Sequence, residues 1–233
     1  MRIPWQRRPA APLPEREASE LWSAPVLERP ARIEELTLLL CDIRGFTQIS
    51  ERLSPQETVT FVNGYLDLVC PPIVGSGGVI DKFMGDGVLA FFEGGGHAGR
   101  ALEAARRILA SVERSGRTSD PIRIGVALHT GEVLIGSIGP RTRREVTIIS
   151  DAVNTLTRLE ELNKVYGSVV VASAATMANV DEGDRAGFAG PIDVSIRGRG
   201  AGIKVFVFGA TVPLGDQQAL DDRLRRFVGR ESG

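Results

Sequence analysis

Hydrophobic positions in this chain fall into short continuous runs and into stretches with helical spacing. Residues 36–43, LTLLLCDI, form a continuous apolar run, which predicts a buried strand. Ser54 is suited to cap a helix that has Pro55 at its first position, and we expect this helix to end near the pair Pro71–Pro72. The apolar residues that give this segment its helical period are Val59, Val62, Leu66 and Val69.

The rest of the pattern predicts a mixture of strands and helices. Residues 77–84 and 87–92 read as two strands joined through Gly85-Asp86-Gly87, a strong signal for a β-hairpin. The other predicted elements are a helix over 97–114, strands over 121–131 and 132–139, a helix over 150–164, a strand over 168–173 followed by a short helix, and a strand over 203–210. This β-α-β-β-α-β order predicts an α+β fold with a ferredoxin-like core, in which helices cover one face of an antiparallel sheet, and extra C-terminal elements.

The two ends of the chain differ from its middle in composition. Residues 1–34 are rich in Pro, Arg, Glu and Ala and lack a sustained period, so we interpret them as a flexible N-terminal extension. Residues 35–210 carry the predicted domain, and residues 211–233 form a charged C-terminal tail. The chain has 233 residues, of which 42% are hydrophobic, so it is long enough for one domain with a substantial core.

Charge and cysteine content narrow the classes of function. The formal net charge is −1, which argues against nucleic-acid binding through an overall basic field. Cys41 and Cys70 both lie in apolar runs, which is typical of reduced thiols. No apolar run approaches the roughly 20 residues that span a bilayer, and the N-terminus lacks the apolar core of a signal peptide. We therefore expect a cytoplasmic protein without a membrane-spanning segment.

Two aspartates stand in apolar surroundings, where a charge is costly unless it is paired or bound to a metal ion. Asp42 ends the strand at 36–43, and Asp86 sits at the tip of the predicted hairpin. If these strands are neighbours, the two carboxylates repel each other, and a divalent cation such as Mg²⁺ or Mn²⁺ relieves that repulsion. The alternative is that Asp42 caps the following helix and Asp86 forms a turn. Residues 43–47 make a glycine-containing turn whose backbone amides can bind a phosphate.

Four segments in this order resemble the catalytic domain of the class III nucleotidyl cyclases. They are CDIRGFT, DKFMGDGVLAFF, HTGEVLIGSIG and ISDAVNTLTRLE, and the resemblance runs from about Leu36 to Ala210. It implies the class III cyclase fold. It also implies that Asp42 and Asp86 bind two divalent cations, Mg²⁺ or Mn²⁺, and that the Ile43 carbonyl adds a ligand.

The same resemblance assigns the substrate contacts. Lys82 and Thr147 occupy the two positions that select the purine, and a lysine at the first position implies ATP. Asn154 matches the residue that orients the ribose, and Arg158 matches the arginine that stabilises charge at the reacting phosphate. The terminal phosphates are assigned to the amides of Arg44, Gly45, Phe46 and Thr47 and, through a looser match, to Arg197.

This sequence departs from the commonest family pattern at two positions. Thr147 stands where an aspartate is usual, and its hydroxyl can still accept from the adenine amino group. A threonine there resembles the bicarbonate-responsive subgroup, so the resemblance implies activation by bicarbonate. Ser150 stands where a glycine usually precedes Asp151, and we expect only a local effect on the backbone.

The implied activity is an adenylate cyclase that forms 3′,5′-cyclic AMP and pyrophosphate from ATP. In this family the metal-binding aspartates come from one chain, and the residues matching Lys82, Thr147, Asn154 and Arg158 come from the other. A homodimer of this chain would therefore build two shared sites. Two alternatives remain open at this point: a guanylate cyclase, and a non-catalytic nucleotide-binding or dimerisation module. A diguanylate cyclase or polymerase-palm relative is disfavoured because the chain lacks a Gly-Gly-Asp/Glu-Glu-Phe segment.

Overall fold

The structure is a computed structural model that describes residues 31–115, 122–138, 145–195 and 202–211. Within these residues, eight strands form one sheet in the order β2-β3-β1-β4-β6-β8-β7, and β5 pairs with β4 beside this path. The strands are β1 (Arg32–Ile43), β2 (Val79–Met84), β3 (Gly87–Phe92), β4 (Ile124–Ile138), β5 (Glu145–Ile149), β6 (Val170–Ser173), β7 (Phe188–Val194) and β8 (Ile203–Phe208). The helices are α2 (Phe46–Ser50), α3 (Pro55–Gly75), α4 (His97–Ser115), α5 (Asp151–Tyr166) and α6 (Ala174–Ala178), and Glu182–Arg185 form a 3₁₀ helix.

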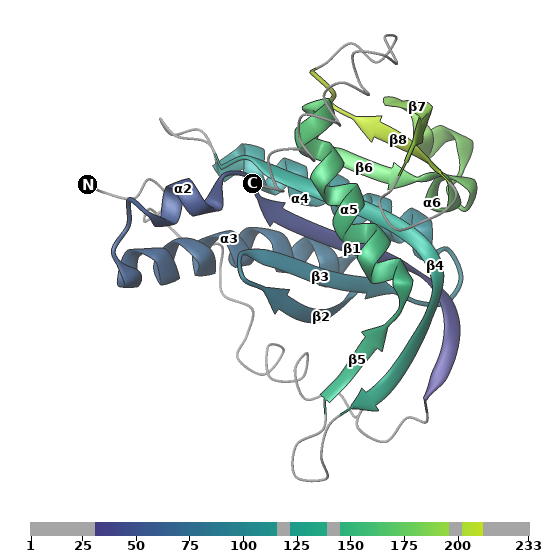
Figure 1. Cartoon of the computed structure of the whole chain (residues 1–233), viewed down its shortest axis with the longest axis horizontal. Helices are drawn as coiled ribbons and strands as arrows, with labels where there is room; N and C mark the ends of the chain where they lie inside the picture. Colours follow the sequence, from purple (N-terminus) through teal and green to yellow (C-terminus); the bar gives the residue numbers. More distant parts are fainter. Residues whose placement is uncertain (1–30, 116–121, 139–144, 196–201, 212–233) are drawn as a thin grey trace.

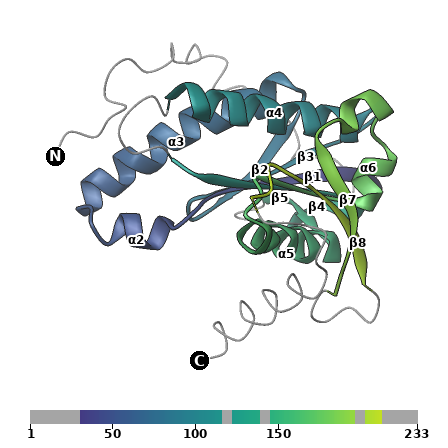
Figure 2. The same cartoon turned by 90° about the horizontal axis from the view of Figure 1, so that it is seen from above.

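Helices cover both faces of the sheet, which corrects the expectation of one covered face. The helices α3 and α4 lie on one side, and α5 crosses the other (Figures 1 and 2). Strand β1 shows why, because its side chains alternate between two buried clusters. Leu39 and Cys41 belong to the cluster under α3 and α4, whereas Leu38 and Leu40 belong to the cluster under α5. A strand buried on both faces has a continuous apolar sequence, as residues 36–43 do.

The α+β prediction is confirmed, and so is the hairpin of β2 and β3, whereas several details differ. The strands predicted over 121–131 and 132–139 are one strand, β4, because β1 pairs with it without interruption from Arg32 opposite Ile135 to Ile43 opposite Ile124. All the strand pairs are antiparallel except β4 with β6, which is parallel. The sequence pattern missed β5 and β7. Strand β1 begins at Arg32, so it includes three residues that we assigned to the N-terminal extension.

Helix α3 begins as predicted and ends later. Ser54 caps it with a reciprocal capping box to Glu57, and Pro55 opens the helix. The helix does not stop near Pro71 but continues through both prolines to Gly75. Proline removes a backbone hydrogen bond in a helix, but here the last turn is held by packing, since Ile73 is fully buried in the core.

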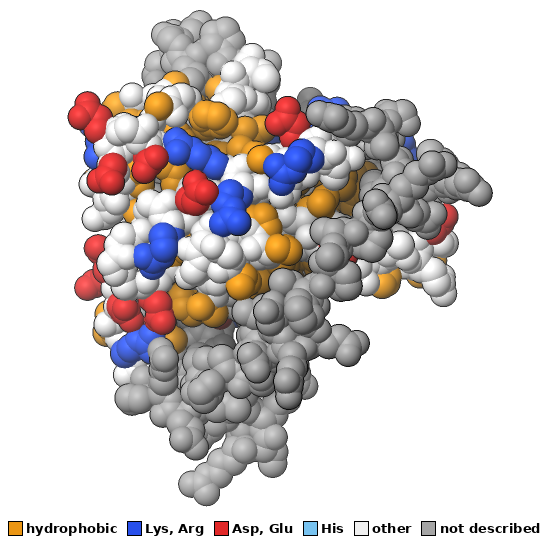
Figure 3. Space-filling view, turned by 180° about the vertical axis from the view of Figure 1, so that it is seen from behind, with side chains coloured by type: hydrophobic (Ala, Val, Ile, Leu, Met, Phe, Trp, Pro, Cys, Tyr) orange, Lys and Arg blue, Asp and Glu red, His pale blue; other side chains and the backbone are white. Residues whose placement is uncertain are grey.

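The surface and the termini add little to the choice of function. Lysines, arginines and acidic residues are mixed over the face seen from behind, with no field of one sign (Figure 3). Cys41 and Cys70 are both free thiols. Among the described residues, none of the helices has the length and apolar character needed to cross a membrane. Residues 1–30 of the predicted N-terminal extension and residues 212–233 of the tail lie outside the described residues.

Candidate active site

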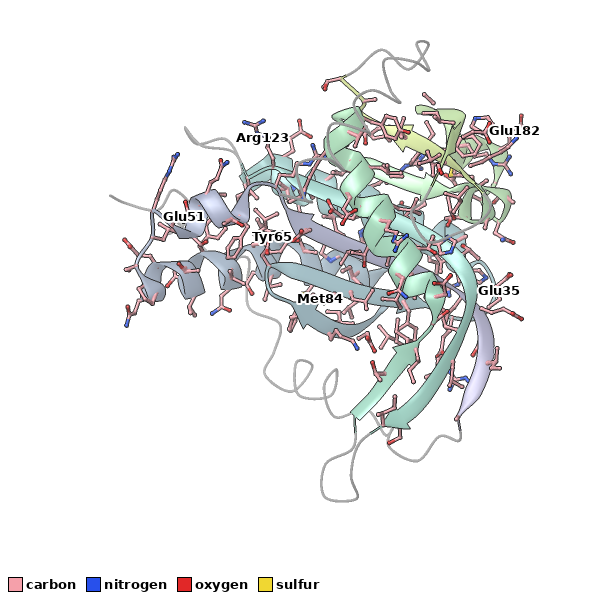
Figure 4. All side chains as sticks on the ribbon, viewed as in Figure 1. Glu35, Glu51, Tyr65, Met84, Arg123 and Glu182 are labelled. Carbon is pink, nitrogen blue, oxygen red and sulfur yellow. The ribbon has the colours of Figure 1, made fainter. Side chains whose placement is uncertain are left out.

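Neighbouring strands bring Asp42 and Asp86 together, as predicted. Strand β1 pairs with β3 up to Cys41 opposite Val88, so Asp42 continues past the paired segment toward the start of β3. The hairpin closes with Met84 opposite Gly87, which leaves Asp86 at its tip (Met84 is labelled in Figure 4). A carbon placed on Gly87 would lie 3.6 Å from Asp42 Oδ1, so the Asp42 carboxylate reaches the base of this hairpin.

The charges of the acidic pair are poorly compensated by the protein. Burial raises the pKa of Asp42 to about 7, and the side-chain contact and negative charge of Asp86 contribute to this shift. The Ile43 amide donates to Asp42 Oδ1 at 3.0 Å, which acts to lower the pKa. Asp86 Oδ2 is buried and has no hydrogen-bond partner. Two carboxylates with an unsatisfied buried oxygen form an oxygen-only donor set, which fits Mg²⁺ or Mn²⁺.

The protein offers few side chains that could bind a metal ion at this place. No group of three or more His, Cys, Asp or Glu side chains in the described residues is arranged to hold a metal ion. A cation at Asp42 and Asp86 would therefore take its other ligands from backbone oxygen, water or a substrate. Magnesium commonly binds in this way, through one or two carboxylates together with substrate phosphates.

Sequence reasoning missed Glu160, a buried acid close to this pair. It lies on α5 with 5% of its surface exposed, and its Oε1 occupies the space where Gly125 would carry a side chain. Gly125 is the residue opposite Asp42 in the register of β1 and β4. Burial raises the pKa of Glu160, while the charges of Lys164 and Arg44 lower it. The signal in the sequence that could have identified Glu160 is that this glutamate lies on the apolar face of a predicted helix.

The turn after Asp42 lets a ligand approach the backbone closely, but one of the four amides predicted to bind phosphate is already hydrogen-bonded within the protein. Gly45 has φ 71°, a left-handed conformation that favours glycine, and it caps α2. The amides of Gly45, Phe46 and Thr47 precede the first hydrogen bond of α2, from Ile49 N–H to the Gly45 carbonyl. The Arg44 amide was also predicted to bind phosphate, but it donates to the Arg123 carbonyl at 2.9 Å.

The side chain of Arg44 is used inside the protein. Its guanidinium donates to the Ser168 carbonyl, and its Nε is buried without a hydrogen-bond partner. Burial lowers the pKa of Arg44, and the charge of Glu160 acts in the opposite direction. Arg44 therefore ties the turn after β1 to the segment that follows α5, and Arg123, labelled in Figure 4, marks the neighbouring loop.

The two predicted purine-selecting residues are in direct contact. Lys82 on β2 donates from Nζ to Thr147 Oγ1 on β5 at 2.6 Å. A third residue, which the sequence reasoning missed, joins them: Asp81 Oδ2 lies 3.2 Å from Lys82 Nζ and 3.4 Å from Thr147 Oγ1. Only the tertiary structure brings β2 and β5 together, since β5 was absent from the predicted elements.

Helix α5 carries the other two predicted residues. Ser150 caps it by accepting from the Ala152 amide at 3.0 Å, so the serine found in place of glycine serves as a cap. Asn154 is exposed and Arg158 is half-buried, one helical turn apart on one face. Neither makes a hydrogen bond or ion pair with Asp42 or Asp86 in this chain. Arg197 lies outside the described residues.

Comparisons with known proteins agree on one family. No protein-family model matches the chain. It is 35% identical over 159 residues to an adenylate cyclase of Anabaena cylindrica, covering 64% of this chain and 32% of the relative. It is 36% identical over 150 residues to the terminal-differentiation specific adenylate cyclase of Dictyostelium discoideum, covering 62% of this chain and 7% of the relative. Among solved structures it resembles the guanylyl cyclase Cya2, with a TM-score of 0.66 and 28% identity over 80% of this chain and 98% of that one. The chain carries a class III nucleotidyl cyclase domain.

The chain matches the guanylyl cyclase Cya2 and a second solved cyclase over nearly their whole length. The adenylyl cyclase CyaB from P. aeruginosa matches with a TM-score of 0.64 and 25% identity, over 81% of this chain and 99% of that one. In contrast, the chain spans about a third or less of the length of the two curated relatives. Those relatives therefore contain further regions that are not matched here.

Proposed function

We propose that this chain is an adenylate cyclase, which converts ATP to 3′,5′-cyclic AMP and pyrophosphate in sites shared by two copies of the chain. The observation that carries the proposal is the acidic pair, in which Asp42 and Asp86 meet where β1 ends and β3 begins, and Asp86 Oδ2 is buried without a partner. The adenylate cyclases among the relatives support the reaction class.

Asp42, Asp86 and the Ile43 carbonyl would hold two divalent cations, Mg²⁺ or Mn²⁺. When bound, such ions neutralise phosphate charge and make a hydroxyl a better nucleophile. The protein's own contribution at this point is a pair of half-buried carboxylates, placed where water is partly excluded and electrostatic interactions are stronger than in bulk solvent.

The remaining residues would bind and orient the nucleotide. The amides of residues 45–47 precede the hydrogen bonds of α2, so they can donate to the terminal phosphates. Asn154 can hydrogen-bond the ribose, and Arg158 can donate to the charge that grows on the reacting phosphate. A fixed donor in that role is worth about 3 kcal/mol. Arg197 would add a positive charge near the terminal phosphates.

Lys82 and Thr147 would read the adenine ring. Adenine presents an acceptor at N1 and a donor at its N6 amino group, which suits an ammonium group and a hydroxyl oxygen. Guanine presents O6 and a protonated N1 instead. The similarity to the guanylyl cyclase Cya2 makes GTP the natural comparison substrate. Activation by bicarbonate stays a prediction from Thr147.

In this proposal a second copy of the chain supplies Arg158 and Asn154, which make no hydrogen bond or ion pair with Asp42 or Asp86 of their own chain. The hairpin and the arm formed by β4 and β5 expose large apolar side chains that suit a contact between copies. These are Val79, Phe83, Met84, Leu134, Ile138 and Ile149. Apolar exposure of this kind is typical of a protein interface.

The test is to incubate the purified protein with ATP or GTP and each metal, and to identify the product by mass spectrometry. We expect cyclic AMP from ATP, more slowly formed cyclic GMP from GTP, and no product with Asp42→Ala. Absence of a cyclic nucleotide from either substrate, in a folded dimeric protein, would refute the proposed activity. More cyclic GMP than cyclic AMP would instead identify a guanylate cyclase.

The shared site has a separate test. Asp42→Ala and Asn154→Ala should each be inactive alone, but mixing the two chains should restore up to about a quarter of the wild-type activity, because half of the dimers are mixed and each mixed dimer has one intact site. Mixing Asp42→Ala with Asp86→Ala is the matched control, since both lesions then fall on the same half of each site. Equal activity in the two mixtures would contradict a site built from two chains.

A further inference from the structure

Asp81 is a buried acid directly beside the two residues proposed to read the base. Its side chain is 2% exposed, whereas the neighbouring Lys82 side chain is 45% exposed. We infer that Asp81 is a specificity-determining positioning residue, which fixes the Thr147 hydroxyl and the Lys82 ammonium in the arrangement that recognises adenine. The inference rests on the proposed adenylate cyclase function.

A break in the strand pairing brings Asp81 to this position. Consecutive residues of a regular strand point to opposite faces, so Asp81 and Lys82 would normally be kept apart. Here the register along β3 passes from Ile80 opposite Ala90 to Lys82 opposite Leu89, which leaves Asp81 as the extra residue of a bulge. Bulges redirect side chains, and this one leaves the Asp81 carboxylate 3.2 Å from Lys82 Nζ.

The Asp81 carboxylate is held from several sides. Burial raises its pKa, while Lys82, the backbone amide of Ile148 and the Thr147 hydroxyl each lower it. A buried carboxylate is costly unless such partners satisfy it. The carboxylate therefore joins β2 to β5 and holds Lys82 and Thr147 together.

The hydrogen-bond donors and acceptors of Lys82 and Asp81 allow only one orientation of the Thr147 hydroxyl group. Lys82 has only donors, so in its 2.6 Å contact Thr147 Oγ1 is the acceptor. The single hydroxyl hydrogen of Thr147 is then directed to Asp81 Oδ2, at 3.4 Å. Thr147 can offer only a lone pair to the base, which suits the adenine N6 amino group and gives no hydrogen to guanine O6.

The hydrogen bonds to Thr147 and Asp81 also constrain the ammonium group of Lys82. One ammonium hydrogen faces Thr147 and a second faces Asp81, so the third is available for adenine N1. Asp81 on β2 thus supplies the negative charge that an aspartate at position 147 would supply in the commonest family pattern. Without that charge, the Thr147 hydroxyl is free to rotate and donate to guanine O6.

The test measures kcat/KM for ATP and for GTP in the wild type, Asp81→Asn, Thr147→Val and the double variant. Asp81→Asn should lower the ATP-to-GTP ratio of kcat/KM about tenfold, because a charge-assisted hydrogen bond no longer orients the hydroxyl. Thr147→Val should lower the ratio similarly, and the double variant should show no further loss. Asp193→Asn, the same change at an exposed site on β7, is the control and should leave the ratio unchanged.

Each outcome decides the inference. An Asp81→Asn ratio equal to that of the wild type, or a double variant whose losses simply multiply, would overturn it. If Asp81→Asn does not fold, an unchanged ratio in Thr147→Val overturns it alone. A wild type that forms no cyclic nucleotide refutes the proposed activity instead, and the same ratios are then taken from dissociation constants of ATP and GTP measured by calorimetry.

Discussion

Replacing Asp42 by asparagine should stabilise the metal-free protein at alkaline pH. Burial and Asp86 raise the pKa of Asp42 from 3.8 to about 7. The folded protein therefore keeps a proton on Asp42 that the unfolded chain releases, and stability falls as the pH rises from about 4 to about 7. An asparagine side chain has nearly the same shape but no proton to lose, so Asp42→Asn removes this loss of stability.

The size of the effect follows from the shift. About three pKa units correspond to about 4 kcal/mol, and we halve this to about 2 kcal/mol because Asp42 is only partly buried and solvent screens its charge. For a chain of this size, about 2 kcal/mol moves the melting temperature by roughly 4–8 °C. The variant and the wild type should differ little near pH 4 and by this amount at pH 8.

The assay is thermal unfolding followed by circular dichroism, in EDTA, across pH 4 to 8. Asp193→Asn serves as the control for the loss of an exposed carboxylate. Adding Mg²⁺ at pH 8 should raise the melting temperature of the wild type by relieving the repulsion between Asp42 and Asp86, and should raise that of Asp42→Asn much less. A difference between variant and wild type that stays constant from pH 4 to 8, or equal Mg²⁺ effects on both, would refute this account of the acidic pair.

Three further substitutions test the scaffold that positions the site. Ser54→Ala removes the capping box of α3 and should lower the free energy of unfolding by about 1 kcal/mol in urea titrations; no change would show that the cap is not needed. Gly99→Ala should raise it by up to about 1 kcal/mol, since no neighbouring atom lies within 4 Å of the added carbon, and a loss of stability would contradict that open space. Gly125→Ala should lower stability by about 1–3 kcal/mol and reduce cyclase turnover, because the new carbon displaces the Glu160 carboxylate beside Asp42; normal turnover would show that Glu160 is not needed where it lies.

The sequence alone determined the elements that have strong local signals. Residues 36–43 could be read as a buried strand because both of their faces are apolar, and Ser54-Pro55 marked the start of α3 because capping depends on a few adjacent residues. The hairpin around Asp86 followed from its glycines. The adjacency of Asp42 and Asp86 could be predicted because Asp42 follows an apolar run and Asp86 stands at the tip of a hairpin, and neighbouring strands of one sheet place such ends together.

Tertiary structure decided what depends on contacts between distant segments. Pro71 did not end α3, because burial of the last turn outweighs the lost backbone hydrogen bond. The Arg44 amide is occupied by the Arg123 carbonyl, a partner that no local pattern reveals. Asp81 joined the base-reading pair only through a bulge in β2 and a strand, β5, that the sequence pattern did not show. Local sequence sets helix capping, turns and the apolar pattern of the strands. Strand register, bulges and the partners of buried polar groups are fixed only when separate segments pack against each other.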